Sequence, residues 1–403
     1  MRRIVLVSIA ISIAAIAAGS ALNEPRAELN PLEITNPSAP GSLAPGLYAA
    51  PNDSLILTWI EPSGTGKALR FAFWKSGKWT APATVIRSTD LQPDSAAPPS
   101  VTKLENGALV AVWSQLVKST GKEDGNFLFA STSTDAGKTW TTPVRIHSDT
   151  GISEHSYDSI AATGPDQATI IWLDSQDWNA KHTYRLMSAT VNSKGVISNE
   201  KTVDHDTCTC CPTAFISTPK LALAAYRGHN PEQIRDIKVA RLAGGNWQKP
   251  LTVHDDLWKI NACPVNGPAL SASGNRLAVL WFTGSNDQPE VKIAMSDDLG
   301  STFRPPITLD SAKEGTRPVG HVAVALMDDG YAVAVWLQHQ SSGTAIVGRR
   351  VSVTGEQGED FTIARGTESG LGYPRLQKAG GTIMVSWSGK TGHDVKTAII
   401  RPR

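Results

Sequence analysis

The sequence predicts an all-β protein, a propeller of seven four-stranded blades that an N-terminal strand closes into a ring. Three observations predict this fold. A run of apolar and β-branched residues that ends in an aromatic residue recurs seven times along the chain. The interval between copies is nearly constant, and helical periodicity is absent throughout. Units of four short strands that repeat every ~40–55 residues are typical of propellers.

The recurring run forms the second strand of each unit, and its aromatic residue anchors the blade. The anchors, spaced 51 to 59 residues apart, are Trp59, Trp113, Trp172, Tyr226, Trp281, Trp336 and Trp387. In the second unit a first strand over 98–104 precedes the anchor strand, and strands over 126–133 and 143–147 follow it. Seven anchors predict seven blades, and an open six-bladed ring is the alternative.

The two ends of the chain are expected to meet in one blade. The seventh unit stops at Arg403 after its third strand and lacks a fourth. The segment PLEIT (31–35) near the N-terminus resembles the fourth strands of the other units, such as PLTVH and PPITL. We therefore expect it to complete the last blade, because closure removes the exposed strand edges that invite aggregation.

The first 21 residues have the order of a secretory signal peptide. Arg2 and Arg3 precede an apolar run over 4–18, and small residues over 19–21 follow it. The run is shorter than the ~20 residues of a spanning helix. We expect a mature single domain over 22–403 that is periplasmic or secreted, with no transmembrane segment; an uncleaved membrane anchor is the alternative. The 38 basic and 37 acidic residues form no basic stripe, which argues against nucleic acid as a partner.

A turn motif recurs between the third and fourth strands of several units. Residues 133–140 match the Asp-box pattern S-x-D-x-G-x-T-W in full, and 296–303 match it with Phe for Trp. Weaker remnants occupy 76–79 and 244–247. The Asp can accept turn amides, the Gly can take a left-handed conformation and the aromatic ring can pack into its own blade.

Over residues 31–403 the chain thus resembles the sialidase superfamily of Asp-box propellers. That resemblance implies a glycoside-processing enzyme or a non-catalytic binding or assembly propeller. Sialidases carry an Arg-Ile-Pro motif in the first inner strand. Here that strand contains Pro45-Gly46-Leu47-Tyr48-Ala49, and no arginine occurs over 30–60.

Candidate site residues follow from propeller geometry, because the loops that lead into the first strand and leave the second open onto one face. Candidate acids, bases and nucleophiles for glycoside hydrolysis are Glu61, Asp94, Asp158, Asp174 and Tyr373, with Tyr157 as a second phenol. Candidate ligand-binding residues are His155, Arg227, Arg235, Asp236, Asn266, Arg317, His321 and Arg375. Arg227, Arg317 and Arg375 come from three blades and can converge on a carboxylate or sulfate. Alternatively, each arginine pairs with a nearby carboxylate.

All four cysteines lie in the loops that lead into two adjacent units: Cys208, Cys210, Cys211 and Cys263. An even count in an exported protein favours two disulfides. The alternatives are Cys208–Cys210 with Cys211–Cys263, or Cys208–Cys263 with a less regular second bridge. A copper or zinc site, with histidine nitrogens added, is a third interpretation.

The sequence predicts a protein that binds or hydrolyses glycans or another small anionic ligand at its central face. An exo-sialidase-like glycoside hydrolase without a cofactor is the enzymatic form of this hypothesis. The alternative is a non-catalytic binding or assembly propeller, with a protein partner and a metal or redox site at the cysteines.

Overall fold

The computed structural model describes residues 29–119, 124–175, 184–367, 371–389 and 393–402. The expected signal peptide over 1–21 lies outside these ranges. Strands dominate the described residues, and the one helical element among them is the short 3-10 turn η1 (Ser285–Asp287). In the same part of the chain, no helix is both long and apolar enough to cross a membrane.

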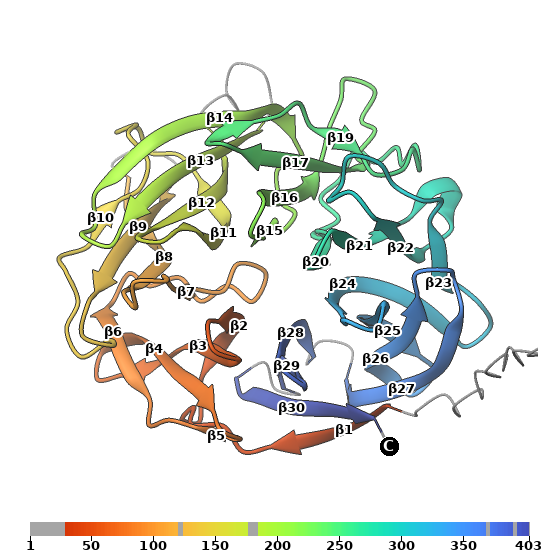
Figure 1. The fold of residues 1–403 in the computed structure, drawn as a ribbon, viewed down its shortest axis with the longest axis horizontal. Helices are drawn as coiled ribbons and strands as arrows, with labels where there is room; N and C mark the ends of the chain where they lie inside the picture. Colours follow the sequence, from red (N-terminus) through yellow and green to blue (C-terminus); the bar gives the residue numbers. More distant parts are fainter. Residues whose placement is uncertain (1–28, 120–123, 176–183, 368–370, 390–392, 403) are drawn as a thin grey trace, which may run out of the picture.

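The strands form seven antiparallel sheets arranged in a ring (Figure 1). Blade 1 contains β2 (Leu43–Ala50), β3 (Ser54–Ser63), β4 (Gly66–Lys75), β5 (Lys78–Trp79) and β6 (Ala83–Ser88). Blade 2 contains β7 (Ser100–Lys103), β8 (Leu109–Val117), β9 (Gly125–Ser133) and β10 (Val144–Arg145). Blade 3 contains β11 (His155–Gly164), β12 (Gln167–Asp174), β13 (Tyr184–Asn192) and β14 (Ile197–Thr207).

The remaining four blades follow in chain order. Blade 4 contains β15 (Ala214–Ser217), β16 (Ala222–Arg227), β17 (Ile237–Ala243), β18 (Asn246–Trp247) and β19 (Leu251–Thr252). Blade 5 contains β20 (Ala269–Ser273), β21 (Arg276–Thr283), β22 (Glu290–Ser296) and β23 (Ile307–Ser311). Blade 6 contains β24 (Thr316–Leu326), β25 (Tyr331–Gln340), β26 (Gly343–Ser352) and β27 (Gln357–Gly366). Blade 7 contains β28 (Gly372–Ala379), β29 (Thr382–Ser388), β30 (Val395–Pro402) and β1 (Leu29–Ile34).

The N-terminal strand closes the ring, as the sequence predicts. Strand β1 pairs antiparallel with β30, from Leu29 opposite Pro402 to Ile34 opposite Thr397 (Figure 1). The seven-bladed prediction is therefore confirmed, and the open six-bladed alternative is wrong. The pairing supplies the fourth strand that the C-terminal unit lacks.

The anchor aromatics lie in the core between blades, each at most 2% exposed. Several are fixed by a carboxylate from the preceding blade. Trp336 Nε1 donates to Asp310 at 2.8 Å, Trp281 Nε1 to Asp256 at 2.6 Å, and the Tyr226 hydroxyl to Asp204 at 2.7 Å. These charge-assisted bonds satisfy polar atoms that burial would otherwise leave unpaired, and they join neighbouring blades.

The turn at 133–140 shows why its residue types are required. Asp135 Oδ1 accepts the amide hydrogens of Lys138 at 3.0 Å and Thr139 at 2.9 Å. Gly137 has φ +86°, and an added Cβ would lie 2.4 Å from the Phe71 ring of the neighbouring blade. Only glycine combines this backbone with that contact. The turn between β22 and β23 repeats the pattern through Asp298, so both turns stabilise the blades.

Candidate functional site at the propeller axis

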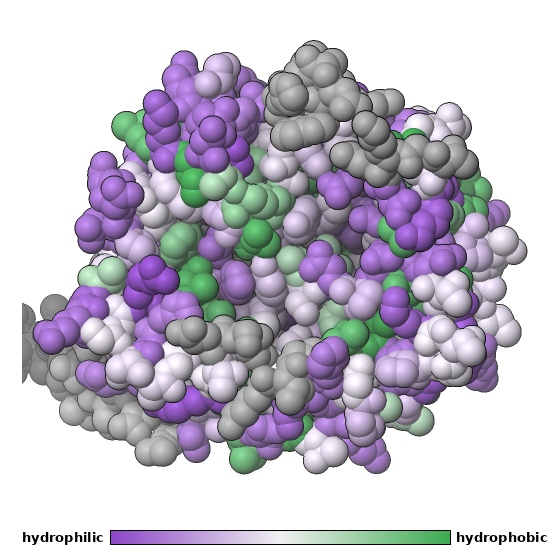
Figure 2. All heavy atoms as spheres, turned by 180° about the vertical axis from the view of Figure 1, so that it is seen from behind, coloured by the Kyte–Doolittle hydropathy of each residue, from purple (hydrophilic) through white to green (hydrophobic). Residues whose placement is uncertain are grey.

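The seven inner strands surround an axial cavity of about 140 Å³. Its lining includes residues from every blade, and its charged members are Asp158 and Arg375. A wider recess of about 680 Å³ lies under the hairpins that join the first and second strands. The space-filling view shows a hollow at the centre of the ring, with polar and apolar groups around it (Figure 2). A ligand over the axis would contact several blades at once.

β-Bulges interrupt four inner strands, β2, β11, β24 and β28, and Asp158 of β11 and Arg375 of β28 line this cavity. The register shifts between Ser156 and Ser159 in β11, between Gly320 and Ala323 in β24, and between Gly372 and Arg375 in β28. Within the first two bulges, Tyr157 has φ +54° and His321 has φ +49°. Positive φ is costly for side chains of this size and concentrates at functional sites, where a bulge can re-aim a residue.

Arg375 is a guanidinium held at the cavity without a counter-charge in contact. Its Nη2 donates to the carbonyl oxygens of Ser95 at 2.9 Å and Ala96 at 3.0 Å. Its Nε is buried and has no hydrogen-bond partner among the described residues, and the carboxylate of Asp94 acts on its charge through space and not through an ion pair. Burial lowers the pKa of Arg375, because water no longer solvates the charge.

His321 and Tyr373 form a stacked pair beside this arginine. Their ring centroids are 3.9 Å apart and their planes differ by 13°. The backbone N–H of His321 donates to Asn266 Oδ1 at 2.8 Å, whereas its Nδ1 is buried with no partner in the described part of the chain. Burial, with the nearby Arg375 charge, lowers the pKa of His321 to about 4. The imidazole is therefore neutral at neutral pH.

Asp158 supplies a carboxyl group from the opposite side of the ring. Burial raises its pKa to about 7, and the negative charge of Asp94 adds to the effect. Its Oδ2 is buried with no partner among the described residues. Asp94 itself is exposed, and its Oδ1 accepts the Ala96 N–H at 2.7 Å. A carboxyl group with such a pKa can act as a proton donor near neutral pH.

Three phenols complete the axial site: Tyr48, Tyr157 and Tyr373. Burial raises the pKa of each, so all three stay protonated at neutral pH. The Tyr48 hydroxyl donates to the carbonyl of Pro99 at 3.2 Å. We call Tyr48, Asp94, Tyr157, Asp158, His321, Tyr373 and Arg375 the axial cluster. Tyr48 is not among the residues predicted from the sequence, although its position in the first inner strand could have identified it.

Arg227 and Asn266 serve the fold instead of facing a ligand. Arg227 is 2% exposed, and its three guanidinium nitrogens donate to the carbonyls of Asn266, Arg235 and Phe282 at 2.7 to 2.9 Å. It also lies 4.7 Å over the Trp258 ring. Asn266 donates to the Pro264 and Val319 carbonyls. The expected convergence of Arg227 with Arg375 on one anion is corrected, because these bonds direct all three guanidinium nitrogens of Arg227 to backbone carbonyls.

Arg235 and Asp236 also have partners within the protein. Arg235 Nη1 donates to the sulfur of Cys208 at 3.3 Å, and its Nη2 to Gln233 at 3.1 Å. Asp236 accepts the backbone N–H groups of Leu257 and Trp258 at 2.9 and 3.0 Å. Asp236 thereby fixes the loop after β19, and the ligand contact expected of this pair stays a prediction.

Four further candidates lie apart from the axial cluster. Glu61 accepts the Trp59 indole at 2.7 Å and faces Arg70. Asp174 is 3.5 Å from Arg185 and 3.8 Å from His155, and His155 also bonds Asp149. Arg317 is an exposed residue of β24. Local ion pairs and hydrogen bonds determine where Glu61, Asp174 and His155 point.

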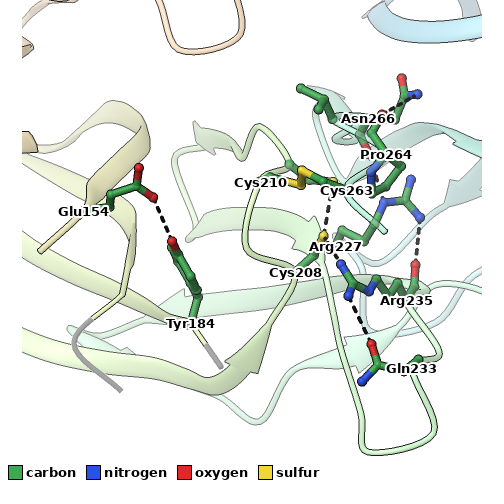
Figure 3. The surroundings of a disulfide bond; sticks show 12 residues. Glu154, Tyr184, Cys208, Cys210, Arg227, Gln233, Arg235, Cys263, Pro264 and Asn266 are labelled. Atoms are coloured by element: carbon green, nitrogen blue, oxygen red, sulfur yellow. Dashed lines mark hydrogen bonds between the residues drawn. A yellow bond between two sulfur atoms is a disulfide. The ribbon is translucent and has the colours of Figure 1, made fainter. Parts of the chain in front are cut away.

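The cysteines form one disulfide, drawn in Figure 3, and one pair of thiols. Cys210 is bonded to Cys263, with Cα atoms 6.0 Å apart. Cys208 and Cys211 are buried, and their sulfurs are 3.4 Å apart. Both predicted pairings are therefore wrong, because Cys210 faces Cys263 across the two loops while Cys208 faces Arg235.

The environment of the two thiols is asymmetric. A hydrogen bond from Cys211 and the charges of Arg227 and Arg235 hold the pKa of Cys208 below the ordinary value of a thiol. Burial and the neighbouring Cys208 sulfur raise the pKa of Cys211. The sulfurs of Cys208, Cys210 and Cys211 lie within 4.8 Å of one another. A copper or zinc ion held by all three would require Cys210 to be reduced, since a disulfide sulfur is not a thiolate ligand.

The fold and the axial cluster define a seven-bladed propeller with a polar site over its axis. The model of the BNR repeat-like domain family matches residues 68–385. The chain therefore belongs to this family, and its resemblance to the sialidase-like propellers is confirmed.

Solved structures share the fold at low sequence identity. A polysaccharide lyase aligns with a TM-score of 0.54 and 10% identity, covering 92% of this chain and 91% of that one. An α-L-arabinofuranosidase of Fusarium graminearum aligns with a TM-score of 0.49 and 13% identity, covering 92% of this chain and 97% of that one. A sialidase of Streptococcus pneumoniae aligns with a TM-score of 0.46 and 11% identity, covering 92% of this chain and 70% of that one. A comparison with curated proteins gave no match. The likeness to the polysaccharide lyase shows the fold alone.

Proposed function

We propose that the protein binds an acidic glycan at the axial cluster and acts on it there. One observation carries the proposal: Arg375 is a buried cation with no carboxylate in contact among the described residues and a buried Nε without a partner. Leaving a charge and a donor unpaired in this way is costly. A carboxylate or sulfate of a ligand would restore both through charge-assisted hydrogen bonds.

The other members of the cluster suit a sugar. Tyr48, Tyr157 and Tyr373 offer aromatic faces for apolar ring surfaces and hydroxyls for hydrogen bonds. The polysaccharide lyase that shares the fold acts, by its name, on a polysaccharide, and we extend that class of ligand to this chain. The three tyrosines come from blades 1, 3 and 7, so a ligand over the axis would contact all of them.

Hydrolysis is the first chemistry that the cluster can support. Asp158, with a pKa of about 7, retains a proton near neutral pH and can donate it to a glycosidic oxygen. Asp94 is the second carboxyl group near it, as its effect on the pKa of Asp158 indicates. Asp94 would then activate water or attack the anomeric carbon.

The stacked His321–Tyr373 pair favours β-elimination as a second candidate chemistry. Arg375 would neutralise the carboxylate of a uronate, which acidifies the adjacent C–H. The neutral His321 would take that proton, and the Tyr373 hydroxyl would protonate the leaving oxygen. The C–H and C–O bonds break, a C=C bond forms, and no oxidant or reductant is needed.

Product analysis tests the proposal and separates the two chemistries. The protein is incubated with uronate-containing and neutral polysaccharides, and products are read as reducing ends and as ultraviolet-absorbing unsaturated uronates. Hydrolysis gives only reducing ends and should be lost in Asp158→Asn. Elimination gives both signals and should be lost in His321→Gln. Binding without turnover would support the non-catalytic propeller, and no binding of any acidic glycan would overturn the proposal.

We also propose that the protein works outside the cytoplasm as a single domain over 22–403. The signal-peptide pattern over 1–21 and the Cys210–Cys263 disulfide support export. Polymeric glycans are extracytoplasmic ligands, so this location agrees with the proposed ligand. Detection of a chain that begins near residue 22 in periplasm or medium tests it, and a full-length cytoplasmic chain would contradict it.

A further inference from the structure

A second polar cluster lies between blades 2 and 3, outside the axial cluster. It contains His147, which follows β10, Asp149, and His155, which begins β11. The two histidine side chains are 0% exposed, and that of Asp149 is 14% exposed. One donor atom from each residue lies within 4.8 Å of the others. Asp149 is thus the side of the cluster that solvent can reach.

In its neutral form, His155 presents a nitrogen lone pair to the carboxylate of Asp149. His155 Nδ1 lies 2.9 Å from the carbonyl oxygen of Asn126, which can only accept, so Nδ1 carries the hydrogen. In a neutral imidazole Nε2 then bears a lone pair, yet it lies 2.9 Å from Asp149 Oδ1. Two lone pairs at that distance repel unless a proton or another cation lies between them.

The ring of His147 packs directly against that of His155 in this cluster. Its ring stacks on that of His155, with centroids 3.5 Å apart and planes 11° apart, and the Phe127 ring meets both edge-on. His147 Nδ1 lies 2.6 Å from the same Asp149 oxygen, while its buried Nε2 has no partner among the described residues. A neutral His147 can donate its Nδ1–H to Asp149, so the contact left to satisfy is that between His155 Nε2 and Asp149, where a bound cation can take the place of a proton.

We propose that His147, Asp149 and His155 bind a divalent transition-metal ion of the zinc class. Two imidazole nitrogens and a carboxylate oxygen are a donor set that Zn²⁺ and Co²⁺ favour. The His155 Nδ1–H bond to a backbone carbonyl is the contact that orients metal-binding histidines. Asp174 Oδ2, 3.8 Å from His155 Nε2, is a nearby fourth donor, although Arg185 shares it.

The bound ion would position the start of β11, the strand that carries Tyr157 and Asp158. His147 and Asp149 belong to the connection between the blades, and His155 is only two residues before Tyr157. A metal would therefore tie that connection to the bulge of β11. The inference stands independently of the glycan proposal, because it rests on the His–Asp cluster alone.

Metal titration of the purified, chelator-treated chain tests the site. Native mass spectrometry with added Zn²⁺ should show one bound ion, with affinity roughly 10–100-fold weaker or lost in Asp149→Asn and His155→Gln. The matched control is His229→Gln, which breaks another His–Asp pair, between His229 and Asp206. Cys208→Ser/Cys211→Ser tests the thiols as the competing location. Both controls should retain the ion.

Spectroscopy of the wild-type chain tests the site even if a variant fails to fold. Co²⁺ added to the wild-type chain should give the visible bands of nitrogen and oxygen ligation, without a sulfur charge-transfer band. Added Zn²⁺ should also raise the thermal midpoint of the wild-type chain. The proposal is overturned if no ion binds, if a sulfur band appears, or if binding follows the cysteine variant.

Discussion

The imidazole of His321 lies flat against the phenol of Tyr373, 3.9 Å away, although the two residues come from adjacent blades. Arg375 is close enough to lower the pKa of His321 and to affect that of Tyr373. A neutral nitrogen, a protonated phenol and a buried cation therefore meet at one point of the axis. This triad is the part of the molecule best suited to chemistry on an anionic ligand.

His321 should titrate near pH 4 in the folded protein. Its pKa is lowered because burial and the Arg375 charge disfavour the imidazolium. Since the unfolded histidine has the ordinary value of 6.5, His321 stabilises the fold above that pH, and this contribution is lost as pH falls through about 4. NMR titration of the histidine rings measures it, and Arg375→Gln should raise the value. A wild-type pKa near 6.5 would refute this environment.

Asp158 should make folding less favourable as pH rises. Its folded pKa of about 7 lies above the ordinary 3.8, so between these values the unfolded chain releases a proton that the folded protein keeps. The contribution of Asp158 to the free energy of unfolding is fully present below about pH 4 and is lost as pH rises through about 7. Asp158→Asn should flatten this part of the curve of thermal midpoint against pH. The exposed Asp166→Asn in the same blade is the control and should retain the wild-type slope.

Replacement of Arg227 should lower the stability of the fold without removing a direct contact to the ligand. Arg227→Ala leaves three buried carbonyls without donors, and we expect a loss of roughly 3 kcal/mol or more in the free energy of unfolding. Urea denaturation measures it. Arg304→Ala, which removes an exposed arginine paired with Asp297, should change stability by no more than about 0.5 kcal/mol. Equal effects of the two variants would contradict the role of Arg227.

The cysteines should give one disulfide and two protected thiols. The intact oxidised chain should be two hydrogens lighter than the fully reduced chain, since one S–S bond replaces two S–H bonds. Alkylation should label Cys208 and Cys211 only after unfolding, because both are 1% exposed. Peptide mapping after alkylation identifies the labelled positions. Four labelled cysteines, or none, would show that the pairing is different.

Much of the fold could be predicted from the sequence, because a propeller repeats its signals. One anchor aromatic marks each blade, from Trp59 in the first to Trp387 in the seventh. The PLEIT segment indicates how the ring closes. These features depend on strand periodicity and short-range packing. They are local, and seven copies reinforce one another.

The axial cluster could be predicted only in part. Asp94, Asp158, His321, Tyr373 and Arg375 were identified from the loops that lead to the axis. Arg227 met the same criterion, yet its guanidinium turns to backbone carbonyls of the next blade. Side-chain direction there depends on bulges and on contacts between blades, which sequence spacing does not encode. The His147–Asp149 pair escaped notice because its third partner, His155, joins it only in the folded connection.

Titration of a defined acidic oligosaccharide against the wild type and Arg375→Gln tests whether Arg375 forms an anion site. Thermal unfolding first confirms that the variant is folded, and the neutral counterpart of the sugar serves as the ligand control. The account predicts that the wild type binds the acidic sugar and that the variant binds it roughly tenfold to a hundredfold more weakly. The neutral sugar should bind both proteins alike. Equal affinity of the two proteins for the acidic sugar would contradict an anion site at Arg375.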